Sequence, residues 1–450
     1  MKDLTERKNR NRRVYLVVIS LAALSCGGTA LAQTNDVTET NAVASGSSTN
    51  VANLGNVTVV GQLNQARSQI VPDLGATVYT QTKAQIETES QGANAPMSQV
   101  ILRAPGVAQD NEASGNLHVR GEHANLQYRI NDVLLPEGIT GFGLELDPRF
   151  IDSIQLITGS LPAQYGFRTA GVVDVQTKSG AFENGGEAEM YGGSYDTIRP
   201  SFEYGGSSSN LNYFVDGSFD HNDLGIENPT ASHSAIHDTT EQGKGFAYLS
   251  YLIDDTSRVN FIASASYSTY EIPDTPGLQN DPGNYSAPGG APWYSGGGIP
   301  TTFNSADVNE NQVEQNYYGV VSYQKSAGQL NYQVAGFGRN SDVHFRPDQN
   351  GDLFYDGEAS DVDRRLFSGG IQADMSYELN DKHTIRGGFM ALEEYVSGDS
   401  ATTVLPMDST DPSSFNPNGP PETFTDNSVL HGLFAGVYLQ DEWKILPEVT

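Results

Sequence analysis

The stretch FSGGIQADMSYEL, residues 367–379, alternates apolar and polar side chains. One face carries Phe367, Ile371, Ala373, Met375, Tyr377 and Leu379, and the other carries Ser368, Gln372, Asp374, Ser376 and Glu378. Because successive side chains of a strand point to opposite faces, this pattern predicts a strand with one apolar and one polar face. The same alternation recurs at 211–220 and 259–268. Both transmembrane barrels and soluble β-sandwiches show it, so the connections between strands must decide.

The connections alternate between short and long. Short polar turns are predicted at 207–210, 254–257, 326–328 and 379–382, and long segments rich in Gly, Pro, Asn and Asp at 221–241, 271–312, 344–363 and 397–428. Short turns at one end and long loops at the other are typical of outer-membrane barrels, so an antiparallel transmembrane β-barrel is favoured over a sandwich. We expect about ten strands in residues 181–450. A barrel enclosing a plug needs roughly 22 strands, so we expect a barrel truncated at about ten.

Composition agrees with a β-rich chain. The 450 residues include 48 Gly and 22 Tyr, and 18% are charged, which suits turn-rich β-structure better than a helical enzyme. The net charge of −30 makes nucleic acid a poor partner, because phosphates need Lys and Arg. No stretch approaches the roughly 20 apolar residues of a transmembrane helix, so any membrane contact is expected through strands.

Residues 1–32 have the pattern of a signal peptide. Basic residues precede a short apolar run from Val14 to Leu24, and Ala30-Leu31-Ala32 provides a cleavage site. The alternatives are a membrane anchor or a lipoprotein modified at Cys26. Cleavage would remove this sole cysteine, leaving neither a disulfide nor a thiolate metal site.

Two regions follow the signal peptide. Residues 33–61 are polar and small, which predicts a disordered segment containing the β-prone stretch NVTVV at 56–60. That stretch is interpreted as an extended peptide for a partner's sheet edge, or alternatively as a first strand. Residues 62–180 predict a small α+β domain. Its expected helices are 82–90 and 96–104, and its expected strands are 117–121, 127–135, 151–159 and 171–178.

Three segments carry a family resemblance. VILRAPGVAQD (100–110), LHVRGEHANLQYRINDVLL (117–135) and IDSIQLITGSLPAQYGFRTAGVVDVQTKSG (151–180) resemble the plug of TonB-dependent outer-membrane receptors. The resemblance implies a mostly β protein in the outer membrane of a Gram-negative bacterium, with a small α+β plug followed by an antiparallel β-barrel. It also implies a receptor rather than an enzyme. The expected function is energy-coupled uptake of a large scarce ligand of siderophore, cobalamin or glycan type, with the plug gating the barrel.

The resemblance also implies partners and site residues. Expected partners are a TonB-type periplasmic energy-transducing protein, outer-membrane lipid and a small or oligomeric extracellular ligand. The TonB box would comprise Val57, Thr58, Val59 and Val60. Plug turns and plug–barrel contacts would involve Arg103, Pro105, Gly106, Arg120, Gly121, Tyr165, Gly166 and Arg168. The three arginines would pair with carboxylates of the barrel wall, or alternatively be ordinary surface residues. Glu122 departs from the family, where a second Gly is common.

Two further sites are considered. Trp293 and Tyr294 offer an aromatic ligand contact in a long loop. Spacing like that of a calcium loop occurs at Asp348, Asn350, Asp352 and Asp356, although Leu353 replaces the expected Gly. The loop histidines His221, His233 and His237 are a weaker metal candidate. No other cofactor is expected. Two alternative functions stay open: a non-transporting surface-binding β-protein, and a non-functional fragment of a receptor gene.

Overall fold

The computed structural model describes part of the chain. The described residues are 54–71, 75–110, 116–123, 125–140, 142, 146–166, 168–182, 184–224, 226, 236–277, 303–406, 419–446 and 449–450. Among these residues, no helix combines the length and apolar character required to cross a membrane.

The first structural unit along the described chain is an α+β plug. Its helices are α1 (Leu54–Ile70), α2 (Lys83–Thr88) and α3 (Met97–Leu102), with short 3-10 turns η1 (Gly92–Asn94), η2 (Pro148–Phe150) and η3 (Ala163–Tyr165). One sheet has the order β1-β7-β8-β5-β6, formed by β1 (Ala76–Thr82), β5 (Leu126–Ile130), β6 (Val133–Leu135), β7 (Ile151–Gly159) and β8 (Gly171–Thr177). A second sheet has the order β2-β3-β4, formed by β2 (Val107–Gln109), β3 (Leu117–Val119) and β4 (Glu122–His123).

These elements match most of the sequence-based expectations for this region. Helices α2 and α3 fall inside the predicted segments, β3, β6, β7 and β8 fall inside predicted strand segments, and β5 begins one residue before its predicted segment. Pro96 stands at the N-cap of α3, just before its first helical residue. The prediction of disorder up to residue 61 is wrong for residues 54–61, because they form the first two turns of α1.

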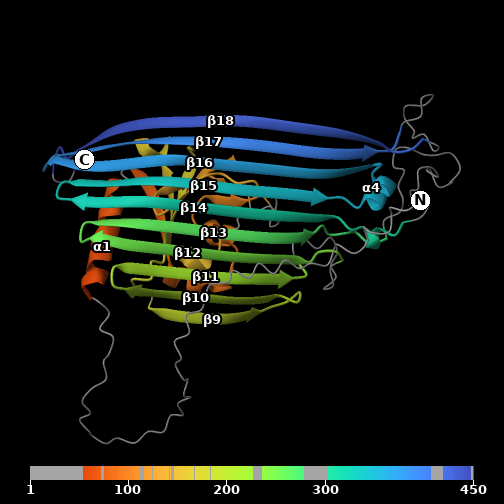
Figure 1. Cartoon of the computed structure of the whole chain (residues 1–450), viewed down its shortest axis with the longest axis horizontal. Helices are drawn as coiled ribbons and strands as arrows, with labels where there is room; N and C mark the ends of the chain where they lie inside the picture. Colours follow the sequence, from red (N-terminus) through yellow and green to blue (C-terminus); the bar gives the residue numbers. More distant parts are fainter. Residues whose placement is uncertain are drawn as a thin grey trace, which may run out of the picture. The chain divides into compact units, whose positions relative to one another are not determined.

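The second unit is a sheet of ten antiparallel strands with the order β18-β17-β16-β15-β14-β13-β12-β11-β10-β9 (Figure 1). The strands are β9 (Gly185–Gly192), β10 (Ile198–Ser208), β11 (Leu211–Asn222), β12 (Thr240–Asp254), β13 (Ser257–Glu271), β14 (Asn311–Ala327), β15 (Leu330–Arg346), β16 (Glu358–Asn380), β17 (His383–Val404) and β18 (Glu422–Trp443). The connection before β14 contains η4 (Ser305–Asp307), and the connection before β16 contains α4 (Gln349–Tyr355).

Every strand of this sheet pairs with its neighbour in sequence. Two-residue turns join the strands at 209–210, 255–256, 328–329 and 381–382, as predicted. The alternate connections are longer, although β16, β17 and β18 extend beyond their predicted ends and shorten the last two. We call the two ends of the sheet the turn end and the loop end.

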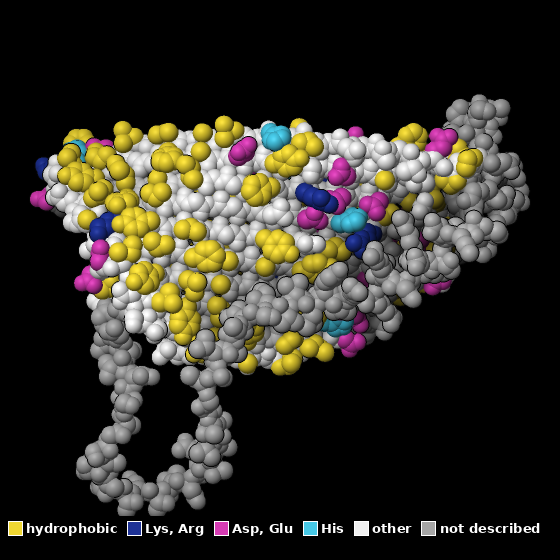
Figure 2. All heavy atoms as spheres, viewed as in Figure 1, with side chains coloured by type: hydrophobic (Ala, Val, Ile, Leu, Met, Phe, Trp, Pro, Cys, Tyr) yellow, Lys and Arg dark blue, Asp and Glu magenta, His cyan; other side chains and the backbone are white. Residues whose placement is uncertain are grey.

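The two faces of the sheet differ in polarity as the alternation predicts. On β16, Phe367 and Ile371 are 56% and 52% exposed, whereas Ser368 and Gln372 are 0% and 3% exposed. Glu378, near the turn end, is an exception, because it is exposed although it belongs to the polar set. Figure 2 shows hydrophobic side chains spread over the strands on the outer face. An apolar outer and polar inner face is the arrangement of a sheet that contacts lipid.

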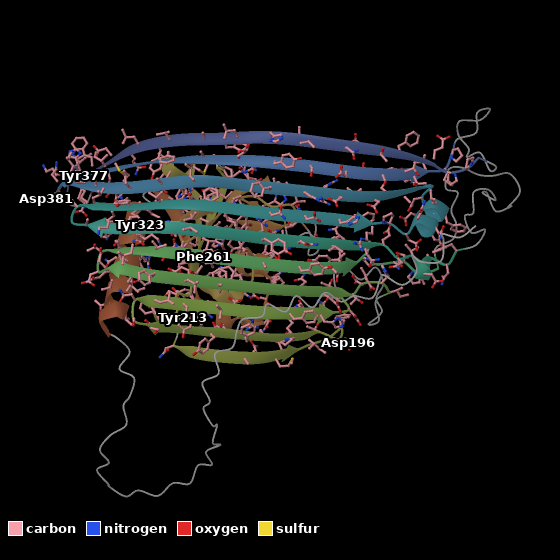
Figure 3. All side chains as sticks on the ribbon, in the orientation of Figure 1. Asp196, Tyr213, Phe261, Tyr323, Tyr377 and Asp381 are labelled. Carbon is pink, nitrogen blue, oxygen red and sulfur yellow. The ribbon has the colours of Figure 1, made fainter. Side chains whose placement is uncertain are left out.

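Tyrosines mark the turn end of the outer face. Tyr213, Tyr323 and Tyr377 lie close to the short turns (Figure 3). The rings of Tyr323 and Tyr332 are 5.9 Å apart on neighbouring strands. An amphipathic ring is suited to the boundary between hydrocarbon and water, so these residues resemble the aromatic girdle of transmembrane barrels.

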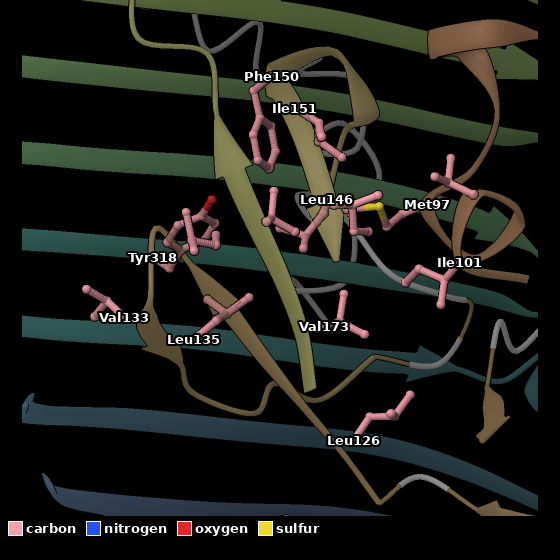
Figure 4. Packing of buried hydrophobic residues seen from close by; sticks show 14 of the residues in the cluster. Met97, Ile101, Leu126, Val133, Leu135, Leu146, Phe150, Ile151, Val173 and Tyr318 are labelled. Atoms are coloured by element: carbon pink, nitrogen blue, oxygen red, sulfur yellow. The ribbon is translucent and has the colours of Figure 1, made fainter. Parts of the chain in front are cut away.

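The plug packs against the inner face of the sheet through a shared hydrophobic core. Figure 4 shows part of this core, in which plug residues such as Phe150 and Leu135 lie near Tyr318 of β14. The Phe150 ring stacks on Phe246 of β12 with centroids 4.1 Å apart. The remaining interface is polar, and it contains the candidate functional site.

Candidate functional site

Helix α1 lies at the turn end, between the plug and the sheet. Val60 and Leu63 are each 1% exposed and pack with Leu252, near the turn end of β12. Two polar side chains of the sheet also bind the helix. Arg258 Nη2 donates to Asn64 Oδ1 at 2.8 Å, and Gln324 Nε2 donates to the carbonyl of Leu63 at 2.6 Å. Packing and polar contacts with the sheet therefore both fix this helix.

The proposed TonB box is part of this helix. In this structure residues 56–60 are helical rather than extended, and their role as a TonB box stays a prediction. Thr58 is exposed, whereas Val60 is buried. Four consecutive β-branched residues, Val57 to Val60, have low helix propensity, so tertiary contacts rather than local preference stabilise these turns.

Arg67 connects α1 to the plug interior. Its Nε lies 3.1 Å from Asp132 Oδ2, and its Nη2 contacts Asn131 Oδ1 at 3.4 Å and also Gln176 Oε1. Asp174 is a second buried carboxyl beside Asp132, and it accepts the Asp132 backbone N–H at 3.2 Å. Burial, followed by the charge of Asp132, raises the pKa of Asp174 to about 8. Arg67 and the buried Arg129 are thus the two cations beside this acidic pair.

Arg386 of β17 caps the other end of α1. Its Nη1 donates to the carbonyls of Gln69 and Ile70, the last residues of the helix. Its Nη2 lies 2.5 Å from Glu442 Oε2 of β18. A cation at a helix C-terminus satisfies unpaired carbonyls and the negative end of the helix dipole.

Towards the loop end, side chains of the sheet bind the plug backbone. Gln372 Oε1 accepts the Leu134 N–H at 3.0 Å, and Arg339 Nη1 donates to the Pro136 carbonyl at 2.9 Å. Further contacts of this kind join Ser341 to Ile139 and Glu314 to Phe142. These are single hydrogen bonds from side chains to backbone, and each contributes modestly to stability. Such an interface can rearrange stepwise, because water can replace each contact.

In the described part of the chain, Arg103 and Arg168 each form an ion pair with a plug carboxylate. Arg103 follows α3 and lies 3.8 Å from Glu89 of the plug. The Arg120 side chain lies beside Gly106 and Gly159, also in the plug. Both side chains therefore lie against neighbouring plug segments in this structure, and their pairing with wall carboxylates stays a prediction.

Arg168 reaches nearer to the wall. Its Nε donates to Glu137 Oε1 of the plug at 2.6 Å, and Glu394 of β17 lies within electrostatic range. A carboxylate of the wall, Glu394, is therefore close to this plug ion pair.

Other plug cations make the expected contacts. Arg149 Nη1 lies 2.8 Å from Glu189 Oε2 of β9, and Lys178 Nζ lies 2.6 Å from Glu203 Oε2 of β10. Only their positions in the chain offered a signal for these pairs. Lys178 directly follows the final plug strand, and Glu189 and Glu203 lie on the first two strands after it.

The predicted plug turns are present. Val107 N–H donates to the Ala104 carbonyl at 3.4 Å across Pro105-Gly106, and Gly106 has a φ of +81°, which fits a type II turn. Arg120 and Gly121, with φ of +54° and +85°, join β3 to β4, which fits a type I′ hairpin turn. Glu122 therefore belongs to β4, where positive φ is not needed.

Tyr165 and Gly166 lie at the end of η3. The Tyr165 ring is 3% exposed, and the Arg129 guanidinium lies 4.9 Å from its centroid. Its packing partners include Ile70 at the end of α1. Tyr165 thus connects α1 with the plug core, and Gly166 ends the 3-10 turn.

The calcium-loop geometry predicted at 348–356 is wrong. Asp348 is the N-cap of α4 and accepts from the backbone N–H groups of Asn350 and Gly351. Asp352 lies inside the helix, and Asp356 is its C-cap. Burial and nearby Glu310 raise the pKa of Asp352 to about 8.

Other predicted loop residues fall into two groups. Trp293, Tyr294 and His233 lie outside the described residues. His237 contacts the Ile272 carbonyl at 2.8 Å and Asn309 Oδ1 at 2.9 Å. His221 lies 3.6 Å from Glu241 on the neighbouring strand. His221 and His237 therefore have separate partners and do not form one site.

Comparisons with known proteins identify the fold. No protein-family model and no curated protein matches the chain. Among solved structures, the ferripyoverdine receptor of the Pseudomonas aeruginosa outer membrane matches with a TM-score of 0.56 at 12% identity, covering 84% of this chain and 50% of that one. Copper transporter OprC matches with 0.57 at 12% identity, covering 84% and 53%. The siderophore receptor PiuA from Acinetobacter baumannii matches with 0.53 at 12% identity, covering 81% and 55%.

The chain thus has the fold of TonB-dependent outer-membrane receptors, a plug followed by antiparallel barrel strands. It spans about half the length of the solved structures that it matches.

Proposed function

We propose that this protein is an outer-membrane receptor of a Gram-negative bacterium that takes up a large, scarce ligand by energy coupling. The observation that carries this proposal is a globular plug bound to the polar face of a sheet whose opposite face is apolar. The apolar face is suited to lipid, and the polar face to a solvated passage. Siderophores, cobalamin and glycans are the ligand classes proposed, and we propose no enzymatic activity.

The plug is the proposed gate. It contacts the sheet through single hydrogen bonds, such as Leu134 to Gln372 and Ile139 to Ser341, and through the ion pairs of Arg149 and Lys178. Helix α1 has contacts on both sides: the buried Arg67–Asp132 ion pair joins it to the rest of the plug, and the Arg386 cap joins it to the sheet. A force applied at α1 would therefore act on the rest of the plug through Arg67 and on the contact with the sheet through Arg386.

Helix α1 is the proposed attachment point of a TonB-type periplasmic protein. Pairing with a strand edge needs an extended backbone, so the turns containing Val57 to Val60 must unwind first. Their β-branched side chains favour the extended state and lower the cost of unwinding. The cost that remains is the exposure of Val60, which is buried in the docked helix.

Uptake measurements test this proposal. Gram-negative cells lacking their own receptors would produce the full chain and receive a radiolabelled ferric siderophore, cobalamin or oligosaccharide. We expect uptake of one probe that a protonophore abolishes. Thr58→Pro should abolish uptake and keep binding, because proline cannot donate a strand hydrogen bond. The matched control Thr58→Val keeps a β-branched residue and should retain uptake.

The alternatives give different results. Binding without energy-dependent uptake would indicate a surface-binding protein. Neither binding nor uptake of any probe, together with absence of a heat-modifiable species from the outer-membrane fraction, would indicate a non-functional fragment. Equal uptake by Thr58→Pro and the unaltered chain would refute the role of residues 57–60.

A further inference from the structure

The three-stranded sheet of the plug gathers two histidines and an aspartate on one face. His118 of β3 and His123 of β4 are directly paired across the strands that the Arg120-Gly121 turn joins. Cross-strand partners point to the same side of a sheet. On the same side, β2 places Ala108 opposite His118, and Asp110 follows two residues later.

The opposite face of β3 explains this orientation. Leu117 and Val119 are 4% and 0% exposed and belong to the main hydrophobic core. Because side chains alternate along a strand, burial of these two turns His118 away from the core. The small Ala108 side chain leaves room beside the His118 ring. The three polar side chains are therefore partly exposed and accessible to an ion from solution.

The spacing of their ligand atoms fits a single metal ion. His118 Nε2 and His123 Nδ1 are 3.1 Å apart, and His123 Nδ1 and Asp110 Oδ2 are 3.3 Å apart. Asp110 Oδ1 also contacts His118 Nε2. Tetrahedral ligands about 2.0–2.1 Å from a metal lie about 3.3 Å from one another. Among the described residues, these three side chains form the group of His, Asp, Glu or Cys residues whose ligand atoms lie close enough together to bind one ion.

We propose that Asp110, His118 and His123 bind a divalent transition-metal ion on the plug. Two imidazoles and one carboxylate suit Zn²⁺, and also Cu²⁺, Ni²⁺ or Co²⁺, rather than the all-oxygen preference of Ca²⁺ or Mg²⁺. Three protein ligands leave a fourth position to water or to another ligand. The site does not depend on the transport proposal, because its residues are separate from α1 and from the interface with the sheet.

The ion would join all three strands of a very small sheet. His118 lies on β3, His123 on β4, and Asp110 directly after β2. The strands contain only three, three and two residues, and so small a sheet has little stability of its own. Metal binding is therefore expected to slow amide hydrogen exchange in residues 116–123. This measurement tests the site separately from the binding affinity.

Calorimetry on the tag-free full chain in detergent tests the site with Zn²⁺, and the absorption spectrum with Co²⁺ reports the coordination geometry. We expect one ion per chain and a tetrahedral Co²⁺ spectrum. His118→Ala and His123→Ala should each weaken binding by at least about tenfold, and Asp110→Asn should weaken it less. The matched control is His344→Ala, which removes a histidine lying 2.9 Å from Asp361. It should bind like the unaltered chain.

Two results would overturn the proposal. One is saturable binding that His118→Ala and His123→Ala leave unchanged, which would place the ion elsewhere. The other is the absence of saturable Zn²⁺ and Co²⁺ binding by a chain whose circular dichroism shows the expected β-structure. All three side chains are partly exposed, so the variants should fold, and their spectra without metal check this.

Discussion

Replacing Arg67 by alanine should release helix α1 from the plug. The substitution removes the guanidinium 3.1 Å from Asp132 and leaves that buried carboxylate, close to Asp174, with Arg129 as the remaining cation in electrostatic range. Breaking a buried ion pair from one side typically costs about 3–5 kcal/mol. Because α1 can undock while the sheet stays paired, we expect this cost to appear as local opening of the helix.

Amide hydrogen exchange of peptides covering residues 60–70 measures this opening. A loss of 3–5 kcal/mol corresponds to exchange roughly 150- to 4,000-fold faster, since about 1.4 kcal/mol is tenfold. The control is Lys325→Ala, which removes an exposed pair with Asp254 at 3.3 Å and should change exchange in α1 by less than about threefold.

A compensated variant separates charge from packing. Arg67→Met combined with Asp132→Asn leaves no buried charge at this pair, so it should recover most of the protection. Exchange in Arg67→Ala within about threefold of the unaltered chain would refute the reasoning. It would mean that Val60, Leu63 and the Arg386 cap hold the helix without the ion pair.

Three further predictions concern stability. The folded-state pKa of Asp174 is raised, so the native state holds its proton more tightly and stability should fall as pH rises from about 4 to about 8. Asp174→Asn should make the free energy of unfolding in urea less dependent on pH over this range, and an unchanged pH dependence would contradict the prediction. Phe150→Ala should cost about 3–5 kcal/mol by removing the stack on Phe246, and a midpoint shift equivalent to less than about 1 kcal/mol would contradict that. Gly180→Ala should prevent formation of the folded, detergent-stable protein, because a Cβ at this position would lie 1.7 Å from the Tyr213 carbonyl oxygen. Normal heat-modifiability of the variant on a gel would contradict this prediction.

Local patterns decided much of what could be predicted. The alternation at 367–379 gave the correct faces of β16, because a strand's side-chain period of two depends only on the backbone. The short turns at 255–256 and 381–382 followed from polar residues between such strands. Gly106 and Gly121 were identified as turn residues because positive φ is strongly favourable to glycine.

Contacts between distant segments could not be predicted in the same way. Arg103 and Arg149 are both plug arginines, yet Arg103 pairs with Glu89 of the plug whereas Arg149 pairs with Glu189 of β9. The helical state of residues 57–60 contradicts their β-branched composition, since burial of Val60 and Leu63 outweighs a local preference of a few tenths of a kcal/mol per residue.

The sequence by itself determined the class of structure: a small α+β region followed by ten antiparallel strands with one apolar and one polar face. Only the tertiary structure decided which charges pair, that α1 docks as a helix, and that Asp110 joins His118 and His123 on one face. The physical reason is range: strand periodicity and turn geometry act between neighbours in the chain, whereas ion pairs and ligand clusters depend on where the strands finally lie.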